Sequence, residues 1–186
     1  MMTSFVRIII VMSLLRQAIG TAQTPPNIVL IGISLFLTFF IMSPILQTVY
    51  NDAAVPYIDE EISAEQAIDV ALSPIRTFMI TQTREDDLMI FSDIGEYEYD
   101  GSEENIPLSV LIPSFMTSEL KTAFTIGFLI YIPFVIIDLI VASVLMSMGM
   151  MMLSPMMISM PFKLMLFVLA DGWILIMQSL TASFAL

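Results

Sequence analysis

Three charged residues interrupt the apolar runs at the end of the chain, and they are the first candidates for chemistry. Asp138 lies inside the run 124–145. Lys163 precedes the run 164–186, which Asp171 interrupts. A charge at a bilayer centre costs about 2.5–3.5 kcal/mol, so such residues usually face a partner or water and are functional candidates. They could bind a coupling ion or relay a proton. We favour a structural bridge between Asp138 and Lys163, because so few groups support a relay.

The corner between these two runs is rich in methionine. Eight of the 17 methionines fall in residues 146–160, with Gly149 and Pro155 as the expected breakpoints. Methionine is unbranched and polarizable, so it fills irregular gaps and suits partners of varied shape. The corner therefore predicts either a packed bend in a helical hairpin or a deformable seal around a pore, and composition does not choose between them.

Composition places the chain outside the usual soluble class. Of its 186 residues, 58% are hydrophobic and the mean hydropathy is +0.91, whereas soluble domains are about 45–50% apolar. The net charge is −12, and 16 of the 18 acids lie in residues 52–119. The negative charge therefore belongs to one hydrophilic insert, and nucleic-acid binding is excluded because it needs a basic surface.

Residue types also bound the chemistry. The chain has no histidine and no cysteine, which excludes imidazole and thiolate catalysis and disulfides. No phosphate-binding loop or nucleophile elbow is present either. An enzyme is therefore the least favoured class, and we expect no cofactor and no metal.

These residues must be positioned by helices, and the expected fold class is all-α. We predict hydrophobic helical hairpins with a small helical hydrophilic insert, because runs of about 20 apolar residues can cross a bilayer. Three parts follow in order: hydrophobic helices over 1–46, an acidic and mainly helical insert over 47–111, and a helical hairpin with the methionine corner over 112–186.

The first part should contain two helices. Residues 1–19 read as a helix that Gly20 ends, and residues 28–45 form an apolar run long enough to span a bilayer. Arg7 interrupts the apolar start, and no cleavage site of the signal-peptide type follows it. We therefore expect the chain to begin within a helix.

Helix signals are clear in the insert. Ser63 and Gln66 form a capping-box signature ahead of an amphipathic stretch. Pro74 predicts a kink or a restart capped by Ser73, and Thr83 predicts a second helix start. Thr117 or Ser118 should cap the next helix.

Side chains of the insert offer several contacts. Phe78 and Phe91 are either covered by a neighbouring subunit or packed within the insert. Glu119 and Lys121 serve either in ordinary capping or in an ion pair between subunits. The loop with Glu96, Glu98, Asp100 and Gly101 follows part of a calcium-loop pattern, but position 12 would be Pro107, so we favour a solvated acidic loop.

Several long motifs resemble the FliP family of flagellar export-gate proteins. They are MTSELKTAF (116–124), MGMMM (148–152), PFKLMLFVLADGW (161–173), RIII (7–10), QTPPN (23–27) and TRE (83–85). The likeness covers nearly the whole chain. It implies a pore-forming core subunit of the type III export gate, in the bacterial inner membrane at the flagellar basal body, with the insert in the periplasm.

The resemblance also implies an assembly. Five copies would join several Q-type subunits, one R-type subunit and other export apparatus proteins in a multi-subunit helical channel for unfolded exported proteins. The expected gasket residues are Met148, Met150, Met151 and Met152. The expected assembly charges are Glu119, Lys121, Asp138, Lys163 and Asp171, and Phe78 and Phe91 would contact neighbouring copies.

The resemblance also bears on the hydrophobic helices. Family members have more of the first hydrophobic helix, and their apolar helices are largely raised out of the bilayer, so predicted spans mark burial between subunits.

The alternative function is an ion-coupled secondary transporter that uses Asp138, Lys163 and Asp171. The lack of a visible inverted repeat weakens it.

Overall fold

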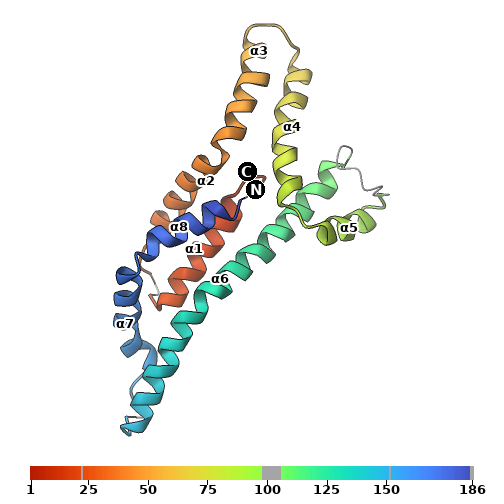
Figure 1. The fold of residues 1–186 in the computed structure, drawn as a ribbon. Helices are drawn as coiled ribbons and strands as arrows, with labels where there is room; N and C mark the ends of the chain where they lie inside the picture. Colours follow the sequence, from red (N-terminus) through yellow and green to blue (C-terminus); the bar gives the residue numbers. More distant parts are fainter. Residues whose placement is uncertain (22, 98–105, 151, 185–186) are drawn as a thin grey trace. The chain divides into compact units, whose positions relative to one another are not determined.

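The fold is helical throughout the part of the chain that the computed structural model describes, which is every residue except 22, 98–105, 151 and 185–186. The elements are α1 (Phe5–Ile19), α2 (Asn27–Val49), the π-helix η1 (Tyr50–Ala54), α3 (Val55–Ile58), α4 (Ala64–Gln82), α5 (Glu85–Ile94), α6 (Leu108–Ser147), α7 (Pro155–Leu169) and α8 (Gly172–Ala182) (Figure 1). These described residues contain no strand. The all-α prediction is confirmed.

The chain forms two compact units, which we call the insert unit and the hairpin unit. The insert unit comprises Met1–Val6, Thr38–Lys121 and Phe184–Leu186. The hairpin unit comprises Arg7–Leu37 and Thr122–Ser183. Each unit is considered separately below.

Two helical stretches among the described residues are long and apolar enough to cross a membrane. They are Asn27–Ile58, with 32 residues, and Leu108–Ser147, with 40 residues. The first contains the predicted run 28–45. The second begins well before the predicted start at Thr117 or Ser118, so the capping prediction there is wrong. Pro113 and Pro133 both lie inside α6 without ending it.

The last apolar run is broken instead of continuous. α7 and α8 are bent by 66° at the residues between them, and Asp171 there has a positive φ of 50°. Lys163 and Asp171 are eight residues apart and would lie on roughly the same face of one continuous helix, but they do not share a face because α7 ends before Asp171 is reached.

The helix signals of the insert are partly confirmed. The Ser63 hydroxyl accepts a hydrogen bond from the Gln66 amide at 3.3 Å, and Gln66 Oε1 accepts one from the Ser63 amide at 3.0 Å, which is the predicted capping box. No restart occurs at Pro74, which lies inside a continuous α4. A second helix, α5, does begin within the predicted segment 83–86, but its N-cap is Arg84, because the Thr83 hydroxyl donates back to the Met79 carbonyl of α4 at 2.7 Å.

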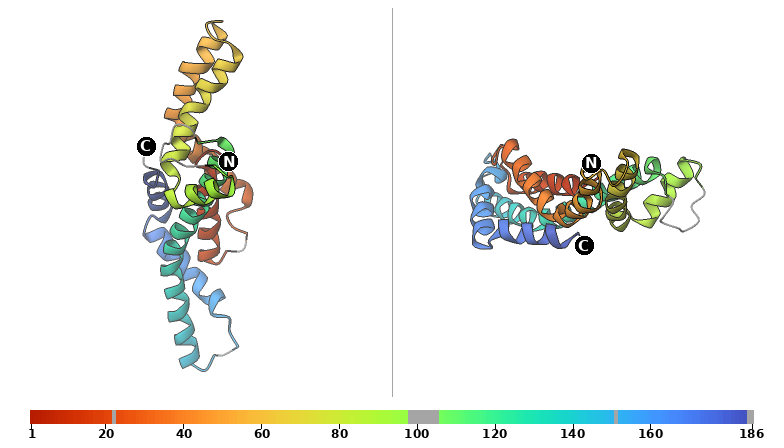
Figure 2. Two further views of the ribbon diagram at one scale, coloured as in Figure 1. Left: turned by 90° about the vertical axis from the view of Figure 1, so that its right-hand side faces the viewer. Right: turned by 90° about the horizontal axis from the view of Figure 1, so that it is seen from above.

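Aromatic and aliphatic side chains form the core of each unit. In the insert unit the Phe78 ring lies 6.0 Å from the Phe115 ring and 6.3 Å from the Phe184 ring. In the hairpin unit Val11 and Leu15 of α1 are buried, and α7 lies beside the second half of α6 in both further views (Figure 2). Leu88 of α5 and Phe167 of α7 are also buried, so both of these helices contribute to the cores.

Candidate functional site

The α6–α7 hairpin is set in register by side chains one helical turn apart. On α6, Phe134 and Asp138 are four residues apart, and on α7, Ser159, Lys163 and Phe167 follow the same spacing. Residues at i and i+4 share a helix face. Asp138 accepts hydrogen bonds from Ser159 and Lys163, while the Phe134 ring lies 6.4 Å from the Phe167 ring. A cluster of hydrogen bonds and an aromatic contact therefore join the same two faces of α6 and α7.

Lys163 is the centre of this hydrogen-bonded cluster. Its Nζ lies 2.7 Å from Asp138 Oδ2 and 3.1 Å from the carbonyl oxygen of Ala18. Ala18 is in the last turn of α1, where the unbonded carbonyls of a helix attract positive charge. The Lys163 side chain is 3% exposed and the Asp138 side chain is 30% exposed. One buried ammonium group thus holds α1, α6 and α7 together. The ion pair that it forms with Asp138 is the one expected from the sequence.

This arrangement bears on ion coupling. The charges of Asp138 and Lys163 compensate each other, and Asp171 is exposed at the bend between α7 and α8. The described residues hold no group of three or more His, Cys, Asp or Glu side chains that could hold a metal ion. Asp138 and Lys163 are thus joined directly, whereas Asp171 lies beyond the end of α7.

A second polar cluster fixes α5 against α6 in the insert unit. Asp87 is buried, and its carboxylate accepts hydrogen bonds from the Lys121 ammonium and, at 2.7 Å, from the Ser118 hydroxyl. The same hydroxyl accepts a bond of 2.9 Å from the Arg84 amide. Ser118 is therefore occupied in joining two helices, which explains why it caps neither.

The environment of Asp87 changes its acidity. Burial by itself would raise the pKa of Asp87, but the hydrogen bonds from Lys121 and Ser118 and the positive charges of Lys121 and Arg84 outweigh it. The pKa therefore lies below its ordinary value of 3.8. Asp87 stays ionised at neutral pH and holds Lys121, one of the predicted assembly charges.

The other predicted positions of the insert unit differ in exposure. Glu119 is fully buried in α6. Phe78 is 3% exposed and is covered by rings of its own chain, whereas Phe91 on α5 is half-buried. Of the calcium-loop pattern, Glu98, Asp100 and Gly101 lie outside the described residues.

The methionine corner begins where α6 ends in a regular helix stop. Gly149 has a φ of 75°, its amide donates to the Met146 carbonyl at 3.1 Å, and the Met150 amide donates to the Leu145 carbonyl at 3.0 Å. This pair of bonds is the Schellman motif, which needs a left-handed residue that glycine supplies without strain. Gly149 is thus a confirmed breakpoint, and Pro155 begins α7.

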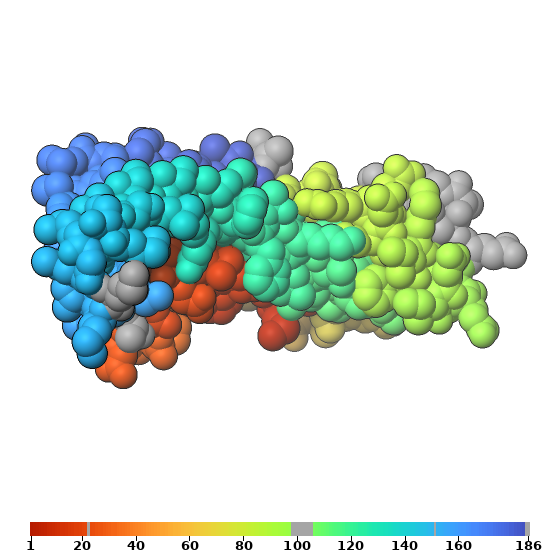
Figure 3. Space-filling view, turned by 90° about the horizontal axis from the view of Figure 1, so that it is seen from below, coloured from red at the N-terminus to blue at the C-terminus, as the bar shows by residue number. Residues whose placement is uncertain are grey.

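The methionines of this corner are strongly exposed. The exposed fractions are 61% for Met148, 42% for Met150 and 100% for Met152, and Met151 lies outside the described residues. The end of the hairpin is visible at the surface of its unit (Figure 3). The side chains do not fill a packed bend in this chain, so they are available to a neighbour.

Sequence reasoning missed several residues of these clusters. Ser159 carried a usable signal, because it lies one turn before Lys163 on the same face. Asp87 carried none, since it stands in the acidic run 85–87 and nothing in sequence marks it as the buried member. Arg7 is also buried, and its guanidinium donates to the Ser183 carbonyl at 2.8 Å at the end of α8.

The fold and these clusters define a helical protein with membrane-spanning capacity, in which part-buried ion pairs hold helices against one another. Comparison with known proteins agrees with this class. The chain belongs to the FliP family, which it matches over residues 1–180.

Curated relatives carry the same family name. The chain is 59% identical over 184 residues to the "Flagellar biosynthetic protein FliP" of Pectobacterium carotovorum, covering 99% of this chain and 71% of that protein. The protein of that name in Bacillus subtilis is 53% identical over 184 residues, covering 99% of this chain and 83% of the relative. The share covered falls to 48% for a Buchnera aphidicola relative, so the chain spans from about half to most of the length of these relatives.

Proposed function

We propose that this chain is a core pore-forming subunit of the flagellar type III protein export gate, in which it helps to form a channel for unfolded export substrates. Membership of the FliP family and the shared name of the relatives support a role in flagellar export. In this proposal the chain has no enzymatic activity, because energy and substrate unfolding come from other export proteins.

The observation that carries the proposal is the amount of apolar helix surface left uncovered by this chain. Only 11% of the apolar window of α6 and 28% of that of Asn27–Ile58 are buried. Such surfaces require lipid or neighbouring subunits. We assign them mainly to neighbours: five copies of this chain with Q-type and R-type subunits, in the bacterial inner membrane at the basal body, with the insert in the periplasm.

The exposed methionines are the proposed gasket. Met148, Met150, Met151 and Met152 of each copy would meet around the axis of the channel, where unbranched thioether side chains can close an irregular opening and yield to a passing polypeptide. The Schellman stop at Gly149 fixes where each copy presents them. The Asp138–Lys163 pair fixes the hairpin that carries them.

The gasket is tested by ion leakage through the assembled complex. Alanine at Met148, Met150, Met151 and Met152 together should raise the resting conductance of the purified complex in planar bilayers and should make cells leak small ions. Alanine at Met156 and Met157 is the matched control, since both are exposed methionines of the same hairpin. Equal conductance in the wild type and the gasket variant would exclude the gasket.

The proposed assembly roles fall into two groups. Asp138 and Lys163 would act indirectly by holding α1, α6 and α7 together, while Lys121, with its side chain 48% exposed, could also contact a neighbour. We keep Glu119, Asp171, Phe78 and Phe91 as proposed assembly positions. Phe78 would act through the core of the insert unit, because its own chain covers it.

Stoichiometry is tested by native mass spectrometry of the detergent-solubilised complex. The expected mass corresponds to five copies of this chain with smaller membrane subunits. Phe91→Ala should shift the distribution toward smaller species, whereas Ile90→Ala, on the adjacent exposed position of α5, should not. A monomer as the sole species in every mild detergent would overturn the proposal.

A further inference from the structure

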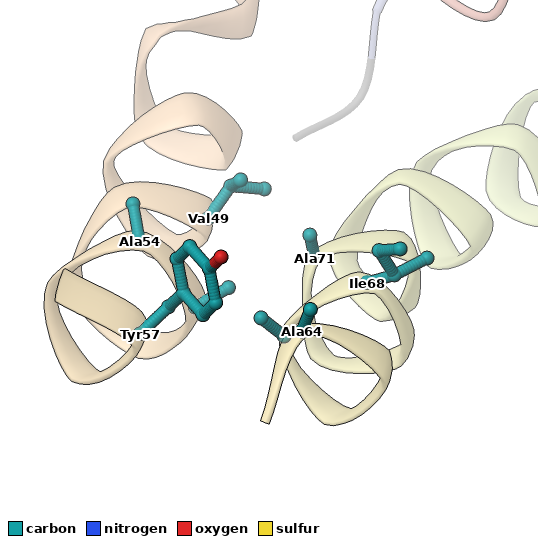
Figure 4. A pocket seen from close by; sticks show the side chains of 8 residues that line it. Val49, Ala54, Tyr57, Ala64, Ile68 and Ala71 are labelled. Atoms are coloured by element: carbon teal, nitrogen blue, oxygen red, sulfur yellow. The ribbon is translucent and has the colours of Figure 1, made fainter. Parts of the chain in front are cut away.

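A pocket in the insert unit is not used by any of the clusters described above. It lies between the end of α2 with η1 and α3 on one side and α4 on the other, and its volume is about 360 Å³. Its lining is almost entirely apolar and consists of Val49, Ala53, Ala54, Tyr57, Ala64, Ala67, Ile68 and Ala71 (Figure 4). The five alanine side chains are too small to fill the space between the two sides, so Tyr57 and Ile68 border an open cavity.

The stretch of chain that lines this pocket, residues 49–71, carries charge of one sign, and we call its acids the rim. Six acids lie beside the lining residues in sequence, every one exposed, and they are Asp52, Asp59, Glu60, Glu61, Glu65 and Asp69. Residues 49–71 contain no lysine or arginine. The next cation along the chain, Arg76, donates to the Ile106 carbonyl. The apolar pocket therefore lies on a strongly acidic stretch of chain, and so many charges favour water over a hydrocarbon layer.

We propose that this acidic-rimmed pocket docks a basic amphipathic segment of another protein, which inserts an aliphatic or aromatic side chain and pairs its lysines or arginines with the rim. Apolar anchors in pockets supply most of the affinity in such contacts. The rim supplies faster association and selects against acidic partners. A second copy of this chain is disfavoured as the occupant, because it would place six acids against six.

The absence of cysteine from the chain allows one reporter to be placed at the rim. Asn51→Cys, at an exposed neutral position beside Asp52, is labelled with an environment-sensitive fluorophore in the full chain in nanodiscs. The probe is a synthetic amphipathic helix with leucine on one face and lysine on the other. Two matched peptides replace each lysine with glutamate or each leucine with glutamine. A label at Ile90→Cys on α5 serves as the control site.

The expected result is saturable binding of the lysine–leucine peptide at the rim label alone, with weaker binding of both matched peptides. Ala67→Leu should weaken it at least about tenfold by filling the pocket. Glu65→Gln with Asp69→Asn should weaken it about twofold to fivefold per charge and reduce its salt dependence. Asp86→Asn with Asp93→Asn, a pair of exposed acids on α5, should leave binding unchanged.

Other results would overturn the assignment. Binding unaffected by Ala67→Leu, or by the milder Ala64→Leu in a variant of unchanged melting temperature, would show that the pocket is not the site. Disulfide-linked dimers through Asn51→Cys would identify a second copy as the occupant. Quenching of the label by brominated lipids would identify an acyl chain instead. Each of these outcomes leaves the export-gate proposal standing, since that proposal is tested at the methionine corner.

Discussion

Leu14 of α1 occupies the space that a side chain at Gly127 of α6 would need. A β-carbon built on Gly127 would lie 2.2 Å from Leu14 Cδ1 and 3.2 Å from Leu14 Cβ. Small residues of this kind let helices approach closely in apolar surroundings, where packing is a main source of association. The contact holds the first helix of the hairpin unit against its longest one.

Gly127→Val should therefore destabilise the hairpin unit by about 1–3 kcal/mol through overpacking. Leu14→Ala should by itself cost about 2 kcal/mol or more. In the double variant the two costs should not add, because the smaller side chain makes room for valine. Thermal melting followed by Trp173 fluorescence measures all four proteins. Additive losses would show that the two positions do not share this space.

Replacing Asp138 should cost more folding stability than replacing Lys163, its partner in the ion pair. Asp138→Asn removes the negative charge opposite a buried ammonium and should cost about 3 kcal/mol, near the figure for breaking a buried pair. Lys163→Met leaves a carboxylate that is 30% exposed and still bonded to Ser159, and should cost about 1 kcal/mol. Melting temperatures in one detergent test this order. Equal losses would mean that burial of Lys163 does not decide the energy of the pair.

Asp87 predicts a pH dependence of defined sign. Because its pKa is lower in the folded chain than the ordinary 3.8, ionised Asp87 stabilises the fold above that value. The contribution is lost as the pH falls through the folded pKa. Asp87→Asn should therefore cost about 1–3 kcal/mol at pH 7, and the gap from wild type should shrink below about pH 4. Asp86→Asn, at the exposed neighbouring position, should show no such convergence in parallel melts.

Local signals in the sequence predicted much of the fold. Helical periodicity, the Ser63–Gln66 capping box and the glycine stop at Gly149 depend on neighbours within one turn, and each is present in the structure. The start of α6 was predicted too late. Ser118 has the residue type of a cap, but tertiary contacts with Asp87 and Arg84 occupy it.

Part of the candidate site, the Asp138–Lys163 pair, was also predictable from the sequence. A buried charge in an apolar run implies a partner, which is why Asp138 and Lys163 could be paired in advance. Contributions from distant segments could not be foreseen, such as the Ala18 carbonyl, which is 145 residues away from Lys163 in sequence. The backbone conformation of Asp171 was not predictable either: aspartate tolerates a left-handed backbone better than most residues do, but this tolerance does not single out one aspartate in the sequence.

Asp171 offers a final prediction that separates its backbone from its charge. Its φ is 50° and its ψ is 41° at the 66° bend between α7 and α8. Left-handed backbone costs about 1–2 kcal/mol for most residues and little for glycine, with asparagine and aspartate intermediate. Asp171→Gly should thus match or exceed wild-type stability, and Asp171→Val should lose about 1–2 kcal/mol.

The charge is isolated by Asp171→Asn, which tolerates the same backbone conformation. If Asp171 acts in assembly through its carboxylate, both the Asn and Gly variants should melt like wild type but form fewer complete complexes by native mass spectrometry. If Asp171 serves only to shape the bend, both should assemble fully, and Asp171→Val should be the single defective variant. Full assembly of Asp171→Asn would therefore remove Asp171 from the proposed assembly charges while keeping its role at the bend.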